Sequence, residues 1–205
     1  MTETNPPITF GVLVYDDVEV LDLGGPFEVF STAGRLARTS DGGPATTVIT
    51  LAPRPGTVTA RGGLRLVPDH TVAEDPPFDI LVVPGGVTTA VESDHALSAW
   101  LRRRHATARL TFGICTGAFL LAQAGLLDGR AATTHWEDED ELAGRWPAVD
   151  VRRDVRWVDD GDIVTSAGIS AGIDASLYVL GRLTSVDLAT RTARQMEYTW
   201  LPTPG

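Results

Sequence analysis

Apolar residues follow two different spacings along this chain, and stretches of the two kinds alternate. Some stretches are almost continuously apolar, which is typical of parallel strands that are covered on both faces. In the others, apolar residues recur every three or four positions, as on the buried side of a helix. Strands are therefore predicted over residues 8–15, 46–52, 58–61, 64–67, 78–83, 110–113, 131–134, 149–158 and 163–166. Helices are predicted over residues 27–38, 95–106, 117–124, 137–145, 175–183 and 186–198.

Turn-forming and capping residues mark where several of these elements begin and end. The pair Gly62-Gly63 and the segment 159–162 (Asp-Asp-Gly-Asp) predict hairpins between the strands that flank them. Pro26 suits the first turn of a helix, Gly125 a left-handed helix end, and Ser185 a helix N-cap. Strands that alternate with helices in this way predict an α/β fold around a mostly parallel central sheet.

The segment 110–122 has the pattern of a strand, a sharp turn and a helix, with Cys115 at the turn. Gly113 and Gly117 stand on either side of the cysteine and lack the Cβ atoms that would crowd such a turn. This is the pattern of a nucleophile elbow. The N–H groups at the start of the following helix favour negative charge, so a lowered thiol pKa and a reactive thiolate are predicted. The alternative is that Cys115 is simply a small buried hydrophobic residue.

Two further features are expected to lie near Cys115. Asp22 stands between two leucines in the loop predicted after the first strand, and burial among apolar neighbours would raise the pKa of its carboxyl group. Gly85 and Gly86 follow the strand over 78–83, where exposed backbone N–H groups would form an oxyanion site; an ordinary turn is the alternative. Ligands in such folds bind at the carboxyl ends of the strands, so these features are predicted to meet at one site.

Composition narrows the classes of protein to which this chain can belong. The 205 residues, 43% of them hydrophobic, suffice for one domain over residues 1–205, with a core over about 8–198 and short polar or proline-containing tails. A net charge of −10 disfavours binding to nucleic acid or to an anionic membrane surface. All 17 basic residues are arginine, which excludes enzymes that depend on a Schiff-base lysine or a P-loop lysine.

The number of cysteines indicates the cellular compartment, and the spacing of the histidines indicates whether a metal is bound. A single cysteine forms no internal disulfide, and the sequence has no apolar run like a signal peptide or a membrane span, so a cytoplasmic protein is expected. The histidines are not spaced as metal ligands are, so neither a metal nor another cofactor is expected. These histidines are His70, His95, His105 and His135.

Three segments together resemble the ThiJ/PfpI superfamily, which has a class I glutamine amidotransferase-like fold, and within it the branch that holds isocyanide hydratase. The segments are 113–118 (Gly-Ile-Cys-Thr-Gly-Ala), 133–136 (Thr-Thr-His-Trp) and 167–174 (Ala-Gly-Ile-Ser-Ala-Gly-Ile-Asp). The resemblance covers about residues 8–198. It implies a flavodoxin-like three-layer sandwich, a homodimer, an elbow cysteine and an acid that reaches it from the loop after the first strand.

Carried onto this sequence, the resemblance implies Cys115 as the nucleophile and Asp22 as the acid. Relatives that act as amidotransferases or supposed proteases have histidine after the cysteine, whereas this chain has Thr116, which weakens a Cys-His hydrolase reading. The implied reaction is hydration of an isocyanide to an N-substituted formamide: the thiolate attacks the terminal carbon, Asp22 supplies a proton, and water releases the formamide from a thioimidate. Backbone N–H groups near Gly86 and Thr116 would stabilise charge, and Thr116 Oγ would hydrogen-bond Asp22. The residues expected to line the pocket are His135, Trp136 and Ile169.

Two other functions, and two roles for His135, remain open at this point. A glyoxalase- or deglycase-like enzyme acting on small aldehydes also needs a thiol and an acid, but Thr116 and the presence of aspartate instead of glutamate weaken it. A stand-alone ligand or redox sensor is the other possibility, because similar domains precede the helix-turn-helix domain of AraC-type regulators, and this chain ends at Gly205 without one. His135 is either catalytic or a hydrogen-bonded structural residue.

Overall fold

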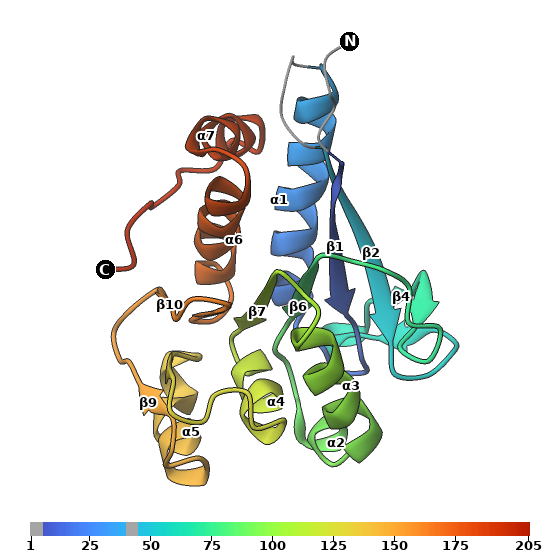
Figure 1. Ribbon diagram of the computed structural model, residues 1–205, viewed down its shortest axis with the longest axis vertical. Coiled ribbons are helices and arrows are strands. Elements are labelled where there is room, and N and C mark those ends of the chain that lie inside the picture. Colours follow the sequence, from blue (N-terminus) through green and yellow to red (C-terminus); the bar gives the residue numbers. More distant parts are fainter. Residues whose placement is uncertain (1–5, 40–44) are drawn as a thin grey trace.

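A sheet of mostly parallel strands forms the middle of the protein in the computed structural model, which describes residues 6–39 and 45–205 (Figure 1). Within these residues the sheet has seven strands, of which only the first two in the following spatial order are antiparallel to each other. The order is β10 (Trp157–Asp159), β11 (Ile163–Ser166), β7 (Leu110–Ile114), β6 (Ile80–Val83), β1 (Ile8–Leu13), β2 (Thr46–Ala52) and β5 (His70–Thr71). Two smaller pairs are β3 (Val58–Thr59) with β4 (Arg65–Leu66), antiparallel, and β8 (Ala131–Ala132) with β9 (Asp150–Val151), parallel.

Helices cover the sheet on both sides (Figure 1). One group that packs together is α1 (Val20–Thr39), α6 (Ala171–Leu183) and α7 (Val186–Gln195). A second group is α2 (Thr89–Glu92), α3 (His95–His105) and α4 (Gly117–Gln123). The remaining helical segments are η1 (Arg61–Gly63), η2 (Trp136–Asp138) and α5 (Glu139–Arg145). The predicted α/β sandwich around a mostly parallel sheet is confirmed.

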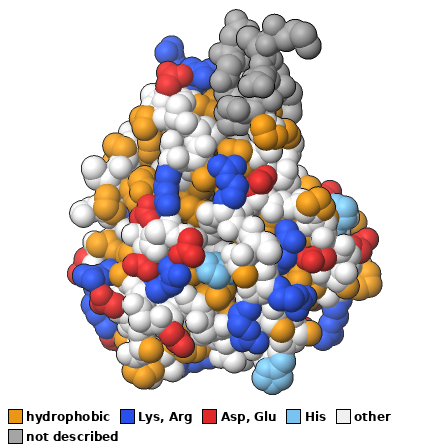
Figure 2. All heavy atoms as spheres, in the orientation of Figure 1, with side chains coloured by type: hydrophobic (Ala, Val, Ile, Leu, Met, Phe, Trp, Pro, Cys, Tyr) orange, Lys and Arg blue, Asp and Glu red, His pale blue; other side chains and the backbone are white. Residues whose placement is uncertain are grey.

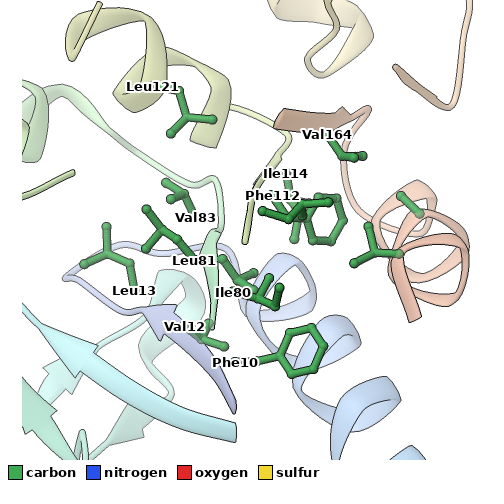
Figure 3. Packing of buried hydrophobic residues seen from close by; sticks show 14 of the residues in the cluster. Phe10, Val12, Leu13, Ile80, Leu81, Val83, Phe112, Ile114, Leu121 and Val164 are labelled. Carbon is green, nitrogen blue, oxygen red and sulfur yellow. The ribbon is translucent and has the colours of Figure 1, made fainter. Parts of the chain in front are cut away.

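The two faces of the sheet carry different buried side chains, because side chains alternate along a strand. Figure 3 shows Phe10, Ile80 and Phe112 on the side of α1 and α6, and Leu81 toward α4. All four are fully buried. Phe10 also stacks on Phe30 of α1, with ring centroids 3.7 Å apart. Since both faces are covered by apolar packing, polar chemistry is confined to the ends of the strands.

Several predicted strands are shorter than expected, and one is divided. The strand predicted over 149–158 is two short strands, β9 and β10, because the chain turns between them at Asp154, whose φ is 56°. Strand β5 and helix α2 are absent from the sequence prediction. They have two and four residues, too few to show a periodic pattern.

Helix α1 begins seven residues earlier than the sequence prediction of 27–38. Pro26 lies inside the helix and not in its first turn, whereas Asp22 lies in the first turn and not in a loop. The Leu23 N–H already donates to the Glu19 carbonyl at 3.2 Å. A proline is tolerated here at the loss of one backbone hydrogen bond, so its presence did not mark the start of the helix.

Both predicted helix ends are confirmed. The Ser185 hydroxyl accepts a hydrogen bond from the Leu188 N–H at 3.1 Å and caps α7, although this helix ends at Gln195 rather than at 198. Gly125 follows α4 with a φ of 72°, in the left-handed region.

The C-terminal tail has no helix or strand, but it is docked on α6. The Leu201 N–H donates to Asp174 Oδ1 at 2.9 Å, and the Trp200 indole donates to the Asp174 carbonyl at 3.2 Å. Arg156 donates to Asp174 Oδ2, and its own backbone N–H donates to the Pro204 carbonyl at 2.6 Å. Asp174 is fully buried, so these contacts compensate a charge inside the protein. The predicted polar N-terminal tail lies mostly outside the described residues.

The surface mixes charges of both signs. On the face drawn in Figure 2, acidic and basic side chains are interspersed and form no extended patch of one sign. Among the helices in the described ranges, none is both long enough and apolar enough to cross a membrane.

The close approach of α4 to the end of β6 predicts a stability difference between two glycine variants. In Gly117→Ala, the new Cβ would lie 2.0 Å from the Val83 carbonyl oxygen, a backbone atom. We expect this overpacking to lower the free energy of unfolding by about 1–3 kcal/mol, measured by urea denaturation. Gly144→Ala is the control, because a Cβ on this glycine of α5 would meet no atom within 4 Å apart from its chain neighbours and the backbone of its own helix. That variant should be unchanged or up to about 1 kcal/mol more stable, and equal losses in both would contradict the explanation.

Candidate active site

The turn between β7 and α4 holds Cys115 in a strained conformation. Its φ is 54°, in the left-handed region that residues other than glycine rarely adopt. The Cys115 N–H donates to the Ser166 carbonyl at 2.9 Å, and the Cys115 carbonyl accepts from the Thr134 hydroxyl at 2.8 Å. Only 6% of the residue is exposed. The predicted strand–turn–helix elbow around this cysteine is therefore present.

Two glycines allow other segments to approach the sulfur closely. A Cβ on Gly168 would lie 2.8 Å from Cys115 Sγ and 2.5 Å from His135 Cδ2. A Cβ on Gly85 would lie 2.7 Å from Thr116 Oγ1 and 2.8 Å from Cys115 Cβ. Any larger residue at either position would displace the groups that surround the thiol.

Asp22 is fully buried next to Cys115. Its Oδ1 accepts a hydrogen bond from the Ile169 N–H at 2.8 Å, while the buried Oδ2 has no hydrogen-bond partner of good geometry among the described residues. Burial raises the pKa of this carboxyl from 3.8 to about 6, although the Ile169 N–H and the Cys115 thiol both act to lower the pKa. The raised pKa predicted from the sequence is confirmed. Ile169 itself has a φ of 59°, which is unusual for a β-branched residue.

The thiol of Cys115 does not have the lowered pKa that the sequence predicts. Burial raises the pKa, the negative charge of Asp22 raises it further, and the Thr116 N–H opposes these effects only in part. The partial positive charge at the start of the seven-residue helix α4 is outweighed, because the sulfur is removed from water and faces a carboxylate. At neutral pH the pair therefore consists of an ionised Asp22 and a protonated Cys115.

Thr116 and Gly86 bond to each other rather than to Asp22. The Gly86 N–H donates to Thr116 Oγ1 at 2.9 Å, and the Thr116 hydroxyl donates to the Gly86 carbonyl at 2.8 Å. Two predictions are therefore wrong: Thr116 Oγ does not donate to Asp22, and the Gly86 N–H is not a free oxyanion donor. Both groups are engaged in joining the two turns that carry the site.

Tyr15, two residues after the end of β1, supports the turn at residues 84–86. Its hydroxyl donates to the Pro84 carbonyl at 2.9 Å, and the Glu19 N–H donates to the Gly85 carbonyl at 2.8 Å. Tyr15 is almost fully buried, and burial raises the pKa of its hydroxyl well above the usual value. The sequence gives no sign of this role, because an aromatic residue at a strand end is indistinguishable from ordinary core.

A pocket of about 240 Å³ opens above Cys115. It is lined by Glu19, Arg61, Gly86, Cys115, Thr116, His135, Glu137, Asp138 and Ile169. His135 and Ile169, which the sequence analysis expects in the pocket, are among these residues. Trp136 is not among the lining residues, and 71% of it is exposed, because the η2 turn directs it away from the site.

His135 lines the pocket, and its Nδ1 faces the neighbouring loop. Nδ1 lies 3.5 Å from Asp138 Oδ2 and 3.8 Å from Glu137 Oε2, and the Glu137 N–H points to it at 3.4 Å. The ring atom that comes closest to the Cβ position of Gly168 is Cδ2. This arrangement favours a structural role, in which the loop fixes the ring as a wall beside the sulfur.

Four lining residues were not anticipated from the sequence: Glu19, Arg61, Glu137 and Asp138. Glu19, Glu137 and Asp138 belong to acidic runs that look like solvated surface. Their position directly after predicted strands is the signal that would have found them, because such segments lie at the ligand-binding edge of the sheet. Arg61 lies in the β3–β4 hairpin, for which the sequence shows no chemistry.

No metal site accompanies these residues in the part of the chain that the structure describes. There, no group of three or more histidine, cysteine, aspartate or glutamate side chains is placed so as to hold a metal ion.

Comparison with known proteins gives a consistent assignment. The sequence matches the DJ-1/PfpI family over residues 10–181. It is 37% identical over 199 residues to an isonitrile hydratase from Pseudomonas putida, covering 95% of this chain and 80% of that protein. It is also 33% identical to the HTH-type transcriptional regulator GlxA of Rhizobium meliloti, covering 89% of this chain but only 55% of the regulator.

Among solved structures, a ThiJ/PfpI family protein from Pseudomonas syringae aligns with a TM-score of 0.83 and 31% identity, covering 96% of this chain and 77% of that one. Drosophila melanogaster DJ-1beta shares the fold, with a TM-score of 0.80 at 20% identity, covering 95% of this chain and 100% of that one. The family match spans most of the chain and agrees with the elbow cysteine and the fold. The chain therefore belongs to the DJ-1/PfpI family.

Proposed function

We propose that the protein adds water to an isocyanide and releases an N-substituted formamide. The observation that carries this proposal is the fully buried Asp22, whose carboxyl group interacts with the Cys115 thiol while the Ile169 N–H fixes its Oδ1. A single carboxyl group in this position can move protons to and from both the sulfur and a carbon bonded to it. The similarity to the Pseudomonas putida isonitrile hydratase supports the same reaction.

In the first half of the reaction, Asp22 acts as a base toward the thiol. The ionised carboxylate takes the proton from Cys115 as Sγ attacks the terminal carbon of the isocyanide. The S–H bond breaks, the S–C bond forms, and the carbon–nitrogen triple bond becomes a double bond. Asp22 then gives the same proton to the carbon, which leaves a thioimidate on Cys115 and an ionised carboxylate.

In the second half, Asp22 acts on water. The carboxylate takes a proton from a water molecule as its oxygen attacks the thioimidate carbon, and this proton passes to the nitrogen. The tetrahedral intermediate then loses the sulfur: the C–S bond breaks, the hydroxyl proton returns to the sulfur through Asp22, and the formamide leaves. The net change is the addition of one water molecule, and no cofactor is required.

The remaining site residues have supporting roles in this proposal. The Thr116 N–H, which acts on the sulfur, stabilises negative charge there, and the Thr116–Gly86 hydrogen bonds fix the turn.

The single cysteine suits a reducing compartment, so we place the protein in the cytoplasm. We also propose that it works as a homodimer on a small-molecule substrate.

Incubation with an alkyl isocyanide should yield the corresponding N-alkylformamide, measured by NMR. Cys115→Ala should abolish turnover, because no thioimidate can form. Methylglyoxal serves as the competing substrate. Formation of lactate without any formamide would support the aldehyde-directed alternative instead, and turnover of neither compound would support a sensing domain like those of the regulators.

Asp22→Asn is expected to lower kcat by about 100- to 10,000-fold, because the amide cannot act as a base toward the thiol. Asp17→Asn is a suitable control. Asp17 is exposed in the same connection and does not line the pocket, and asparagine tolerates its φ of 64°. Steady-state kinetics on the isocyanide compare the variants. Retention of wild-type kcat by Asp22→Asn would remove Asp22 from the mechanism.

The pH profile follows from the need for an ionised Asp22. Because burial raises the pKa of Asp22 to about 6, kcat/KM should rise with pH and level off above about 7. At pH 5 it should be about tenfold below the plateau, since only the ionised fraction reacts. A profile that falls with rising pH would mean instead that Asp22 must start the reaction as an acid.

A further inference from the structure

Carboxylates outnumber cationic groups around the pocket. Glu19, Glu137 and Asp138 line it, and among the lining residues Arg61 is the one with a permanent positive charge. Arg61 Nη1 lies 3.4 Å from Glu19 Oε2, so these two charges compensate each other. The charges that remain are those of Glu137 and Asp138.

The two remaining carboxylates are not neutralised by arginine. In the described part of the chain, the ion pairs of Glu137 and Asp138 are with His135 alone, at 3.8 Å and 3.5 Å. An imidazole carries no permanent positive charge, so His135 does not take the place of an arginine beside them. The nearest arginines in the sequence are paired elsewhere: Arg130 with Asp160 and Asp162, and Arg145 with Glu92 and Glu141.

The side chains of Glu137 and Asp138 reach both the pocket and solvent. The Glu137 side chain is 64% exposed and that of Asp138 is 30% exposed. Asp138 is close enough to Cys115 for its negative charge to contribute to the raised pKa of the thiol. The two carboxylates thus belong to the same pocket as the reacting sulfur.

The buried end of the site fixes how a substrate must lie. Asp22 is fully buried beside Cys115, so the reacting carbon has to be at that end of the pocket. The substituent on the isocyanide nitrogen then occupies the rest of the pocket, whose lining includes His135, Glu137 and Asp138.

We propose that the preferred substrate carries a cationic group, such as an ammonium, on its nitrogen substituent, and that Glu137 and Asp138 bind this group. The inference rests on the proposed isocyanide hydration and names its substrate class. Neutral isocyanides react more slowly, and isocyanides that carry a carboxylate are the poorest substrates, because they meet uncompensated negative charge in a partly desolvated pocket.

Three isocyanides with the same alkyl chain test this preference: one ends in a methyl group, one in a primary ammonium and one in a carboxylate. Their kcat/KM is measured at pH 8 and low salt. We expect the ammonium compound to exceed the neutral one by about fivefold or more, and the carboxylate compound to fall below it by a similar factor. Added salt should reduce both differences.

Matched variants assign the preference to the two carboxylates. Glu137→Gln and Asp138→Asn should each reduce the ratio of kcat/KM between the ammonium and carboxylate compounds by about threefold to tenfold. Asp140→Asn is the control, because it removes the same charge from the same acidic run but does not line the pocket, and its side chain is 93% exposed. It should leave the ratio unchanged. An equal effect of all three variants would overturn the assignment and indicate a general charge effect.

A second measurement does not depend on turnover of any isocyanide. Methanethiosulfonate reagents form a disulfide with the Cys115 sulfur and release methanesulfinate, and they exist with an ammonium or a sulfonate tail. The ratio of the two modification rates, followed by intact mass, should exceed that of a free small thiol by about fivefold or more and should fall in Glu137→Gln. If this holds while no isocyanide is turned over, the proposed hydration fails and the cation preference stands. Equal rates for both reagents, relative to the free thiol, would overturn the inference.

Discussion

The site depends on keeping a carboxylate out of water beside a thiol. Raising the pKa of Asp22 from 3.8 to about 6 corresponds to about 3 kcal/mol that the ionised carboxyl costs the folded protein at neutral pH. This cost declines as the pH falls from about 6 to 3.8, because the folded state then binds the proton more readily than the unfolded chain does. This cost is what remains after the Ile169 N–H has offset part of the desolvation, and the packing of the rest of the protein must supply it. The same burial that destabilises the carboxylate makes it a stronger base toward Cys115.

Much of the fold and of the site could be predicted because it depends on short, continuous segments of the sequence. The segments 46–52 and 163–166, for example, are strands with the bounds that the sequence predicts. The elbow at Cys115 could be expected from the residues just before and after it, and the raised pKa of Asp22 from its position between two leucines in the sequence. That these residues lie together follows from the general rule that the ends of parallel strands share one edge of the sheet.

The features that could not be predicted depend on contacts between distant segments. The early start of α1 is set by the Glu19 carbonyl and the turn near Gly85, not by Pro26, which carries the local signal. The pKa of Cys115 is raised by burial and by a carboxylate 93 positions earlier in the chain, effects that a local argument from the helix N-terminus omits. Arg61 reaches the pocket only because a short hairpin folds over the end of β1, and its backbone N–H bonds to the Val18 carbonyl.

The docked C-terminal tail is linked to the thiol site through the segment that begins α6. Asp174 belongs to the same segment as Ile169, and its buried carboxylate is satisfied in part by the Leu201 N–H, while Pro204 accepts from Arg156. Contacts made by residues 200–204 therefore help to hold the segment that also orients Asp22. These residues support the geometry of the thiol site although none of them lines the pocket.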